Sequence, residues 1–248
     1  MPDTTIKTEI LIHDLKVPLS VIDAGAKSLL NRQDSYGPLT EKQEKVIKRI
    51  IRNTLTTQRL VNDVMELGRS REGVVTLSRF SISSLVTTVL VEIFDLSNPR
   101  MADIIRKTDA YDSLVKTLDP CGFRVDFDTK TWKTEVCLDK AKVRQILRNL
   151  VSNAFKHRAD LVEVSGRIQG KELVLKVRDD GRGIPPSAHK KIFDTYFTTG
   201  GSIENAINSH GLGLAGVMIL LRDMGGSLTL DSDDGKGAEF TVVIPLTQ

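Results

Sequence analysis

The first seventy residues carry two apolar stripes at helical spacing, separated by a short polar loop. The first stripe comprises Leu11, Leu15, Pro18, Ile22, Ala26 and Leu29. The second comprises Val46, Ile50, Leu55, Val61, Val64 and Leu67. Each falls on one face of a helix at about 100° per residue. Two helices alone bury two such stripes poorly, whereas two copies of the hairpin bury them as a four-helix bundle. The sequence therefore predicts a homodimer.

Local signals place the hairpin boundaries. The loop at residues 31–39 contains Gly37-Pro38, and Thr40-Glu-Lys-Gln43 is a capping box that predicts the start of the second helix. Residues 68–73 are small and charged and are predicted to be a linker. We therefore expect a helical domain at 1–70 and a second domain at 74–248.

The second domain mixes α and β signals, so the chain is predicted to be α+β. Predicted strands lie at 74–79, 123–128, 161–168, 172–178, 227–231 and 238–244. Predicted helices lie at 82–96, 101–118, 139–157 and 211–224.

Composition excludes several function classes. The chain has 248 residues, a net charge of +3 and 5% aromatic residues, which argues against nucleic-acid binding. It has no apolar run of about 18 residues and no secretory leader, so we expect no membrane contact by this chain and a cytoplasmic location. Cys121 and Cys137 are too few for a disulfide framework and are better interpreted as small core residues than as a redox sensor.

Two glycine turns stand in a specific order. Asp179-Asp-Gly-Arg-Gly-Ile184 follows a predicted strand, and Gly181 and Gly183 are expected to let the backbone approach a ligand closely. Gly211-Leu-Gly-Leu214 opens a predicted helix, whose N–H groups can bind an anion. The composition of residues 198–210 between them suits a mobile lid. Either turn alone is weak evidence, because bland turns have the same composition, but the order is specific.

A third motif lies on the helix predicted at 139–157. Asn149, Asn153 and Lys156 fall on one helical face. A carboxamide oxygen suits Mg²⁺, and a lysine suits phosphate. The alternative is a solvated polar face, with four apolar residues turned inward: Leu147, Leu150, Val151 and Phe155.

These motifs resemble a known superfamily. NLVSNAFKH at 149–157, DDGRGIP at 179–185 and HGLGLAG at 210–216 resemble the N box and glycine boxes of the GHKL ATPases, whose Bergerat fold is an α/β sandwich. Residues 192–197 and 235–245 resemble the phenylalanine box and closing strand of histidine-kinase catalytic domains. His13-Asp-Leu-Lys-Val-Pro18 resembles their H box. The chain thus resembles a sensor histidine kinase of two-component systems.

The resemblance implies ATP and Mg²⁺ as cofactors, with Asp179 recognising the adenine amino group and Asn153 holding the metal. Asn149 and Lys156 would lie near the phosphates. The other implied nucleotide-site residues are His157, Gly181, Gly183, Ile184, Phe197, Gly211, Leu212, Gly213 and Leu214.

The resemblance also implies that His13 is the phosphoacceptor, that Asp14 is its general base, and that the phosphoryl group passes to a response-regulator receiver domain. Lys16 would steady phosphate charge, although an ordinary surface lysine is an equal alternative. His13 lies about 200° around the helix from Leu11, so it is expected to face solvent. Pro18 removes one helical hydrogen bond and can kink the helix.

The sequence departs from the family pattern in several places. Val17 stands where many histidine kinases carry Thr or Asn, which predicts weak or absent phosphatase activity. Asp180 replaces a common Asn, Arg182 a common Pro, and Gly200 a lid lysine. Residues 97–121 are longer than the usual connection.

Other functions stay open at this point. The chain could be a catalytically degenerate dimeric scaffold, or a chaperone-like or repair ATPase of the same superfamily. It could be a short kinase or the cytoplasmic core of a longer, membrane-bound sensor. The stimulus, the partner regulator and the choice between cis and trans phosphorylation are not readable from the sequence.

Overall fold

The computed structural model describes residues 3–70, 75–197 and 213–246. The chain divides into two compact units, Met1–Glu72 and Gly73–Gln248, and each is described by itself. In the part of the chain described, no helix has the length and apolarity needed to cross a membrane.

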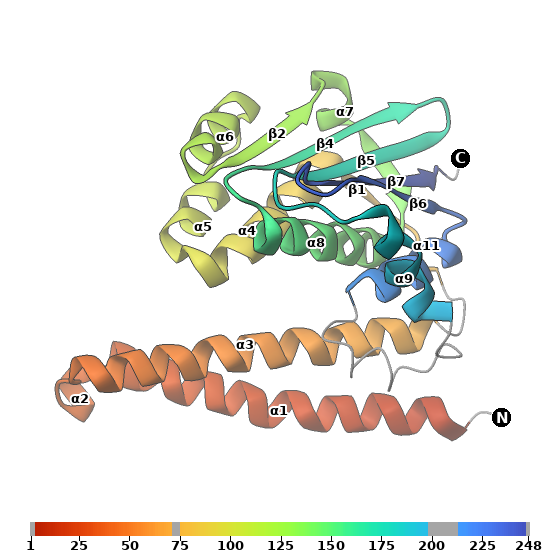
Figure 1. The fold of residues 1–248 in the computed structure, drawn as a ribbon. Helices are drawn as coiled ribbons and strands as arrows, with labels where there is room; N and C mark the ends of the chain where they lie inside the picture. Colours follow the sequence, from red (N-terminus) through yellow and green to blue (C-terminus); the bar gives the residue numbers. More distant parts are fainter. Residues whose placement is uncertain (1–2, 71–74, 198–212, 247–248) are drawn as a thin grey trace. The chain divides into compact units, whose positions relative to one another are not determined.

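The first unit is a helical hairpin. Helix α1 (Asp3–Asn31) and helix α3 (Glu41–Ser70) lie side by side and antiparallel, with the short helix α2 (Gln33–Tyr36) at the turn (Figure 1). The capping box is confirmed, since Gln43 N donates to Thr40 Oγ1 at 3.3 Å and Thr40 N donates to Gln43 Oε1 at 2.9 Å. The predicted linker begins too early, because α3 stays helical through Ser70.

The two helices pack through a narrow seam that overlaps the predicted stripes only at Ala26 among the buried residues. Ala26 of α1 and Ile47 and Thr54 of α3 are buried in this seam. Of the nine stripe members whose side chains the structure describes, six stay exposed in the single chain; Ile22, for example, is 47% exposed and Ile50 is 40% exposed. The hairpin therefore carries an uncovered apolar surface beside its own seam.

The second unit is built on a mixed five-stranded sheet (Figure 1). Its strands, in spatial order, are β2 (Phe123–Phe127), β4 (Val162–Gln169), β5 (Glu172–Asp179), β7 (Ala238–Pro245) and β6 (Ser227–Ser232). The β2–β4 pair is parallel and the others are antiparallel. A separate antiparallel pair joins β1 (Ser78–Ser81) to β3 (Glu135–Leu138).

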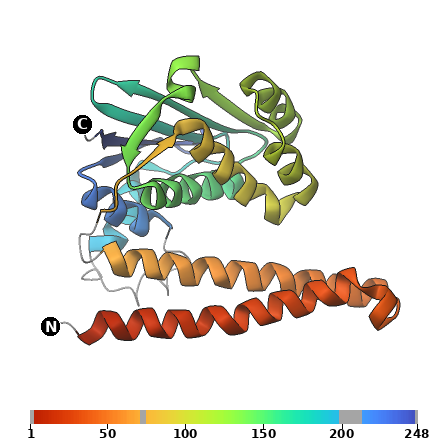
Figure 2. The same cartoon turned by 180° about the vertical axis from the view of Figure 1, so that it is seen from behind.

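Helices cover one face of this sheet, as Figures 1 and 2 both show. The covering helices are α4 (Ile82–Ser97), α8 (Lys140–His157) and α11 (Gly213–Asp223). Among the residues that the structure describes, the other helices of the unit are α5 (Pro99–Arg106), α6 (Tyr111–Leu118), α7 (Thr129–Lys133), α9 (Pro186–Phe197) and the 3₁₀ turn Asp119–Cys121. Alternate residues of β2 and β7 are buried toward the helices, which is the pattern of a half-covered sheet. The predicted α+β class is confirmed.

Several predicted elements differ from the observed ones. The helix predicted at 101–118 is two helices, because Lys107 and Thr108 donate to carbonyls three residues back and end α5. Helix α7 and strand β3 were not predicted. The first strand begins at Ser78 rather than at residue 74. Strand β3 has four residues and pairs with β1 across more than fifty positions, so local periodicity does not reveal it.

The end of β5 is tied to the loop after α8 by Asp180. Its Oδ1 accepts hydrogen bonds from the N–H groups of Ala159, Asp160 and Leu161, at 3.0, 3.0 and 2.9 Å. Asp180 is exposed; the desolvation that remains raises the pKa of its carboxyl, but the three backbone donors lower this pKa by more, so it lies below the usual value. The departure from the common Asn thus has a structural role.

We predict that Asp180→Ala lowers the free energy of unfolding by about 1–2 kcal/mol at pH 7, because three backbone donors lose a charged acceptor. Asp180→Asn keeps the Oδ1 acceptor and should lose less. Because the pKa of Asp180 is lowered in the folded state, its ionised form stabilises the folded protein. The excess in free energy of unfolding of the wild type over Asp180→Asn should therefore be complete above about pH 4 and should disappear as the pH falls through the folded-state pKa. Urea unfolding of the wild type and the two variants at several pH values measures the loss of stability and its dependence on pH. Equal stability of wild type and Asp180→Ala would contradict this role.

Candidate functional site

A cavity of about 490 Å³ opens in the second unit where three motifs meet. It is lined by Asn153, His157, Asp179, Arg182, Gly183, Ile184, Ile192, Leu214, Ala238 and Phe240. Half of these residues are apolar, and the others supply one carboxamide, one imidazole, one carboxyl and one guanidinium. An apolar cavity with a few polar groups suits a planar ligand that has a polar edge.

Asp179 is the buried carboxyl of this cavity. It ends β5, is 6% exposed, and accepts a hydrogen bond on Oδ1 from Gly181 N at 3.0 Å. Burial raises the pKa of Asp179 above its usual value, although the Gly181 N–H and the nearby His157 act in the opposite direction. A carboxyl held in this way can accept a hydrogen bond from a ligand amine.

The glycines of the first turn serve the protein's own backbone. Gly183 has φ +71°, and a Cβ there would lie 1.9 Å from Asp233 O. A Cβ on Gly181 would lie 2.1 Å from His157 O. The expectation that both glycines also admit a ligand stays a prediction; of the two, only Gly183 lines the cavity.

Helix α8 satisfies both interpretations of its motif. Leu147, Leu150 and Val151 are buried, as the structural alternative expects. Asn153 and His157 line the cavity, as the functional interpretation expects. Asn149 is half-buried and Lys156 is exposed, and neither lines the cavity.

Some predicted site residues lie outside the described part of the chain. Gly211, Leu212 and the predicted lid at 198–210 are among them, as is the side chain of Phe197 at the end of α9. Gly213 begins α11, and Leu214 reaches the cavity.

Sequence reasoning missed four cavity residues: Arg182, Ile192, Ala238 and Phe240. The alternation of the closing strand is the sequence signal for Ala238 and Phe240, and the position of Arg182 between the two glycines of the first turn is the signal for its place at the cavity. Their place at the cavity depends on how β7 and α9 pack against the glycine turn.

His13 belongs to the other unit, within the continuous helix α1 that also contains Pro18. The His13 side chain lies outside the described residues, so its solvent-facing orientation stays a prediction. Asp14 is exposed and Lys16 is half-buried on the same helix.

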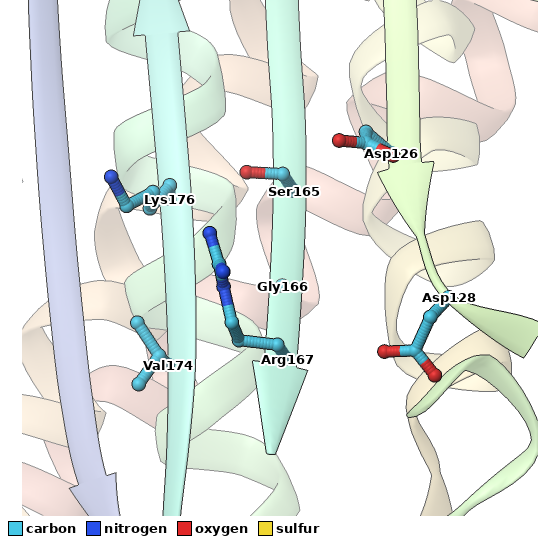
Figure 3. Close-up of a pocket in the computed structure, with 7 residues that line it drawn as sticks. All are labelled: Asp126, Asp128, Ser165, Gly166, Arg167, Val174 and Lys176. Atoms are coloured by element: carbon cyan, nitrogen blue, oxygen red, sulfur yellow. The ribbon is translucent and has the colours of Figure 1, made fainter. Parts of the chain in front are cut away.

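A second hollow, of about 240 Å³, lies on the sheet and is lined by side chains of β2, β4 and β5 together with Asp128 (Figure 3). Two of its four charged side chains have protein partners: Asp128 caps α7 through Thr131, and Lys176 Nζ lies 2.6 Å from Glu239 Oε1. None of the predicted site residues lines it. The motifs therefore point to the first cavity as the functional site.

Two family models match the chain. The His Kinase A (phospho-acceptor) domain matches residues 9–73. The histidine kinase-, DNA gyrase B- and HSP90-like ATPase domain matches residues 138–248. The match to the first model includes His13, and the match to the second includes the residues that line the cavity.

Curated relatives and a solved structure agree with these models. The chain is 31% identical to the circadian input-output histidine kinase CikA of Synechococcus elongatus, covering 94% of this chain and 29% of the relative. It is 30% identical to the aerobic respiration control sensor protein ArcB of Escherichia coli, covering 98% of this chain and 28% of the relative. The crystal structure of full-length ShkA in complex with AMPPNP matches with a TM-score of 0.65 and 25% identity, over 99% of this chain and 46% of that one.

The chain thus spans less than a third of the length of these curated relatives. It contains a phosphoacceptor-type helical region followed by an α/β sandwich of the GHKL type, in the order found in histidine kinases. The chain belongs to the sensor histidine kinase family.

Proposed function

We propose that this chain is the dimeric core of a histidine kinase, which transfers the γ-phosphoryl group of ATP to His13 and then to an aspartate of a response-regulator receiver domain. The observation that carries the proposal is the cavity that joins Asn153, Asp179 and Leu214, residues from three separate motifs. The complex of the related ShkA with AMPPNP, an ATP analogue, supports the same ligand here.

In this proposal the adenine lies in the apolar part of the cavity, and its amino group donates to Asp179. Asn149, Lys156 and the turn at 211–214 lie toward the phosphates, and Arg182 adds a positive charge at the cavity. The remaining motif residues, His157, Gly181, Gly183, Ile184 and Phe197, complete the nucleotide site.

Asn153 would hold Mg²⁺. Among the described residues, no three His, Cys, Asp or Glu side chains gather as metal ligands. A single carboxamide oxygen from the protein fits an ion that keeps water and phosphate oxygens as most of its ligands, as Mg²⁺ does. When bound, the ion neutralises phosphate charge.

We further propose that the kinase acts in the cytoplasm.

The proposed reaction is an in-line displacement. A neutral ring nitrogen of His13 attacks the γ-phosphorus, the bond from that phosphorus to the β–γ bridging oxygen breaks, and ADP leaves with the electron pair. Asp14 accepts the proton from the other ring nitrogen, and Lys16 lies near enough in sequence to steady the transferred charge. Val17 offers no hydrogen bond to a water, so we propose weak or absent phosphatase activity.

The uncovered surface of the hairpin supports the dimer. On α1 the half-buried Leu19, Asp23 and Leu30 lie about 60–100° around the helix from the open Ile22, at 3.6 residues per turn. The same separation holds on α3 between Ile47 and the open Val46 and Ile50. Two faces at this angle are what each helix of a four-helix bundle needs, because it has two neighbours.

The phosphoacceptor is tested with γ-labelled ATP. Wild-type protein with Mg²⁺ should acquire acid-labile, base-stable label, and His13→Gln should lose it while still binding ATP. Equal labelling of His13→Gln would show that His13 is not the acceptor. Steady ATP hydrolysis without a labelled protein would favour a non-kinase ATPase. Nucleotide binding without ATP hydrolysis and without a labelled protein would favour a scaffold.

We predict that Asp179→Asn weakens ATP binding about 10- to 100-fold, because it removes a charged acceptor from the cavity. Burial penalises the charged form, so this variant should be no less stable than wild type at pH 7. Because the pKa of Asp179 is raised, the ATP affinity of the wild type should begin to fall at a higher pH than the ordinary pKa of an aspartate would give, and the affinity of Asp179→Asn should not show this fall. Calorimetric titration with ATP at several pH values measures these affinities, with Asp126→Asn as the control. Unchanged affinity in Asp179→Asn would refute the role.

The dimer is tested with a matched pair of lysine substitutions. Ile22→Lys places a charge on the open apolar face and should shift the protein to monomers at micromolar concentration. Ala24→Lys lies on the opposite, exposed side of α1 and should leave the dimer intact. Sedimentation velocity distinguishes the two states. A monomeric wild type, or a fully dimeric Ile22→Lys, would contradict this interface.

A further inference from the structure

A buried ion pair joins the two helices that border the cavity. Lys142, in the first turn of α8, is 1% exposed, and its Nζ donates to Asp223 Oδ2. Asp223 is the last residue of α11, and its side chain is 11% exposed. The proposed nucleotide chemistry uses neither residue.

Each charge of this pair stands at the wrong end of its own helix. A cation is unfavourable at a helix N-terminus, where Lys142 lies, and an anion is unfavourable at a C-terminus, where Asp223 lies. Each charge instead suits the end of the neighbouring helix. The two charges are therefore favourable only when α8 and α11 are docked together.

The pair lies at the opposite end of these helices from the cavity. Lys142 meets the C-terminal end of α11, whereas Asn153 and His157 of α8 share the cavity with Leu214 of α11. The two helices are therefore antiparallel. The ion pair lies about 16 Å along α8 from Asn153, at 1.5 Å per residue.

The N-terminus of α8 is itself held in place. Asp139 is buried and caps the helix by accepting from Lys142 N at 3.1 Å. Its other oxygen accepts from Thr76 N at 2.9 Å. Lys142 thus projects from a fixed helix end, so it can define where α11 ends.

We propose that Lys142 and Asp223 are positioning residues, which set the position of α11 along α8 and thereby place the first turn of α11 at the nucleotide. Apolar contacts between helices tolerate small shifts, whereas a buried ion pair is satisfied in one geometry. The consequence for ATP rests on the proposed function, but the positioning itself does not.

The test replaces the pair by apolar residues of similar size, Lys142→Met with Asp223→Leu. Removing both charges avoids an unpaired buried charge, so the protein should keep its melting temperature within a few degrees. The Kd and KM for ATP should rise at least about fivefold, with a smaller change in rate at saturating ATP. Backbone amides of residues 214–223 should exchange faster with deuterium in the absence of nucleotide.

Two further variants sharpen the test. The control, Arg144→Met with Glu92→Leu, removes a 2.5 Å ion pair between α8 and α4 and should leave ATP affinity unchanged within about twofold. The exchanged pair, Lys142→Glu with Asp223→Lys, retains an ion pair and should recover most of the wild-type affinity and slow exchange. Recovery should be incomplete, because each exchanged charge suits the end of its own helix rather than that of the neighbouring helix.

The outcomes separate this inference from the proposed function. Wild-type affinity and exchange in the apolar variant would overturn the positioning role, as would a folded exchanged pair that binds ATP weakly. If the apolar variant does not fold, the exchanged pair decides the question. If wild-type protein binds no ATP, the proposed function fails, and the exchange rates of α11 still decide whether the pair positions it.

Discussion

The second unit depends on the burial of one face of α8 against the sheet. Leu147, Leu150, Val151 and Ala154 are almost inaccessible to water, and burying such side chains contributes about 1.5–3 kcal/mol each for the larger ones. This burial leaves α8 no freedom to rotate, because turning the helix would expose the stripe. The polar edge that carries Asn153 and His157 is thereby directed at the cavity.

A second constraint acts where β5 ends. Gly183 and Gly237 both have positive φ, and a Cβ on either would lie 1.9–2.0 Å from a carbonyl oxygen, of Asp233 and Asp179 respectively. The glycine turn and the β6–β7 turn are thus in backbone contact. Asp180 adds a third contact, to the loop after α8. These contacts hold Asp179 rigidly, which is the condition for a single carboxyl to recognise one ligand edge.

The two units differ in how completely they bury their apolar residues. The sheet unit encloses a continuous core, whereas the hairpin leaves Leu15, Ile22, Leu29, Val46 and Ile50 open. In the proposed reaction the acceptor belongs to the open unit and the nucleotide to the closed one. The proposed reaction then combines a rigid nucleotide site with a helical surface that we propose a second copy covers.

Periodicity within the sequence was enough to locate most elements. The capping box at Thr40, the helix predicted from residue 82 and the strand predicted at 123–128 were all readable because each depends on residues within a few positions of one another. The motif order predicted which stretches meet at the site. The predicted helix at 101–118 was wrong, because a short turn of 3₁₀ type at Lys107 interrupts a pattern that local periodicity continues.

The sequence by itself determined the family, the helical hairpin and the motif residues Asn153 and Asp179, since these depend on residue type and local spacing. Only the tertiary structure decided that Gly181 and Gly183 serve backbone packing, that Arg182, Ala238 and Phe240 line the cavity, and that Lys142 meets Asp223. The reason is physical: hydrogen-bonded caps and amphipathic faces arise within one or two turns of chain, whereas a contact between residues 81 positions apart depends on the path of everything between them.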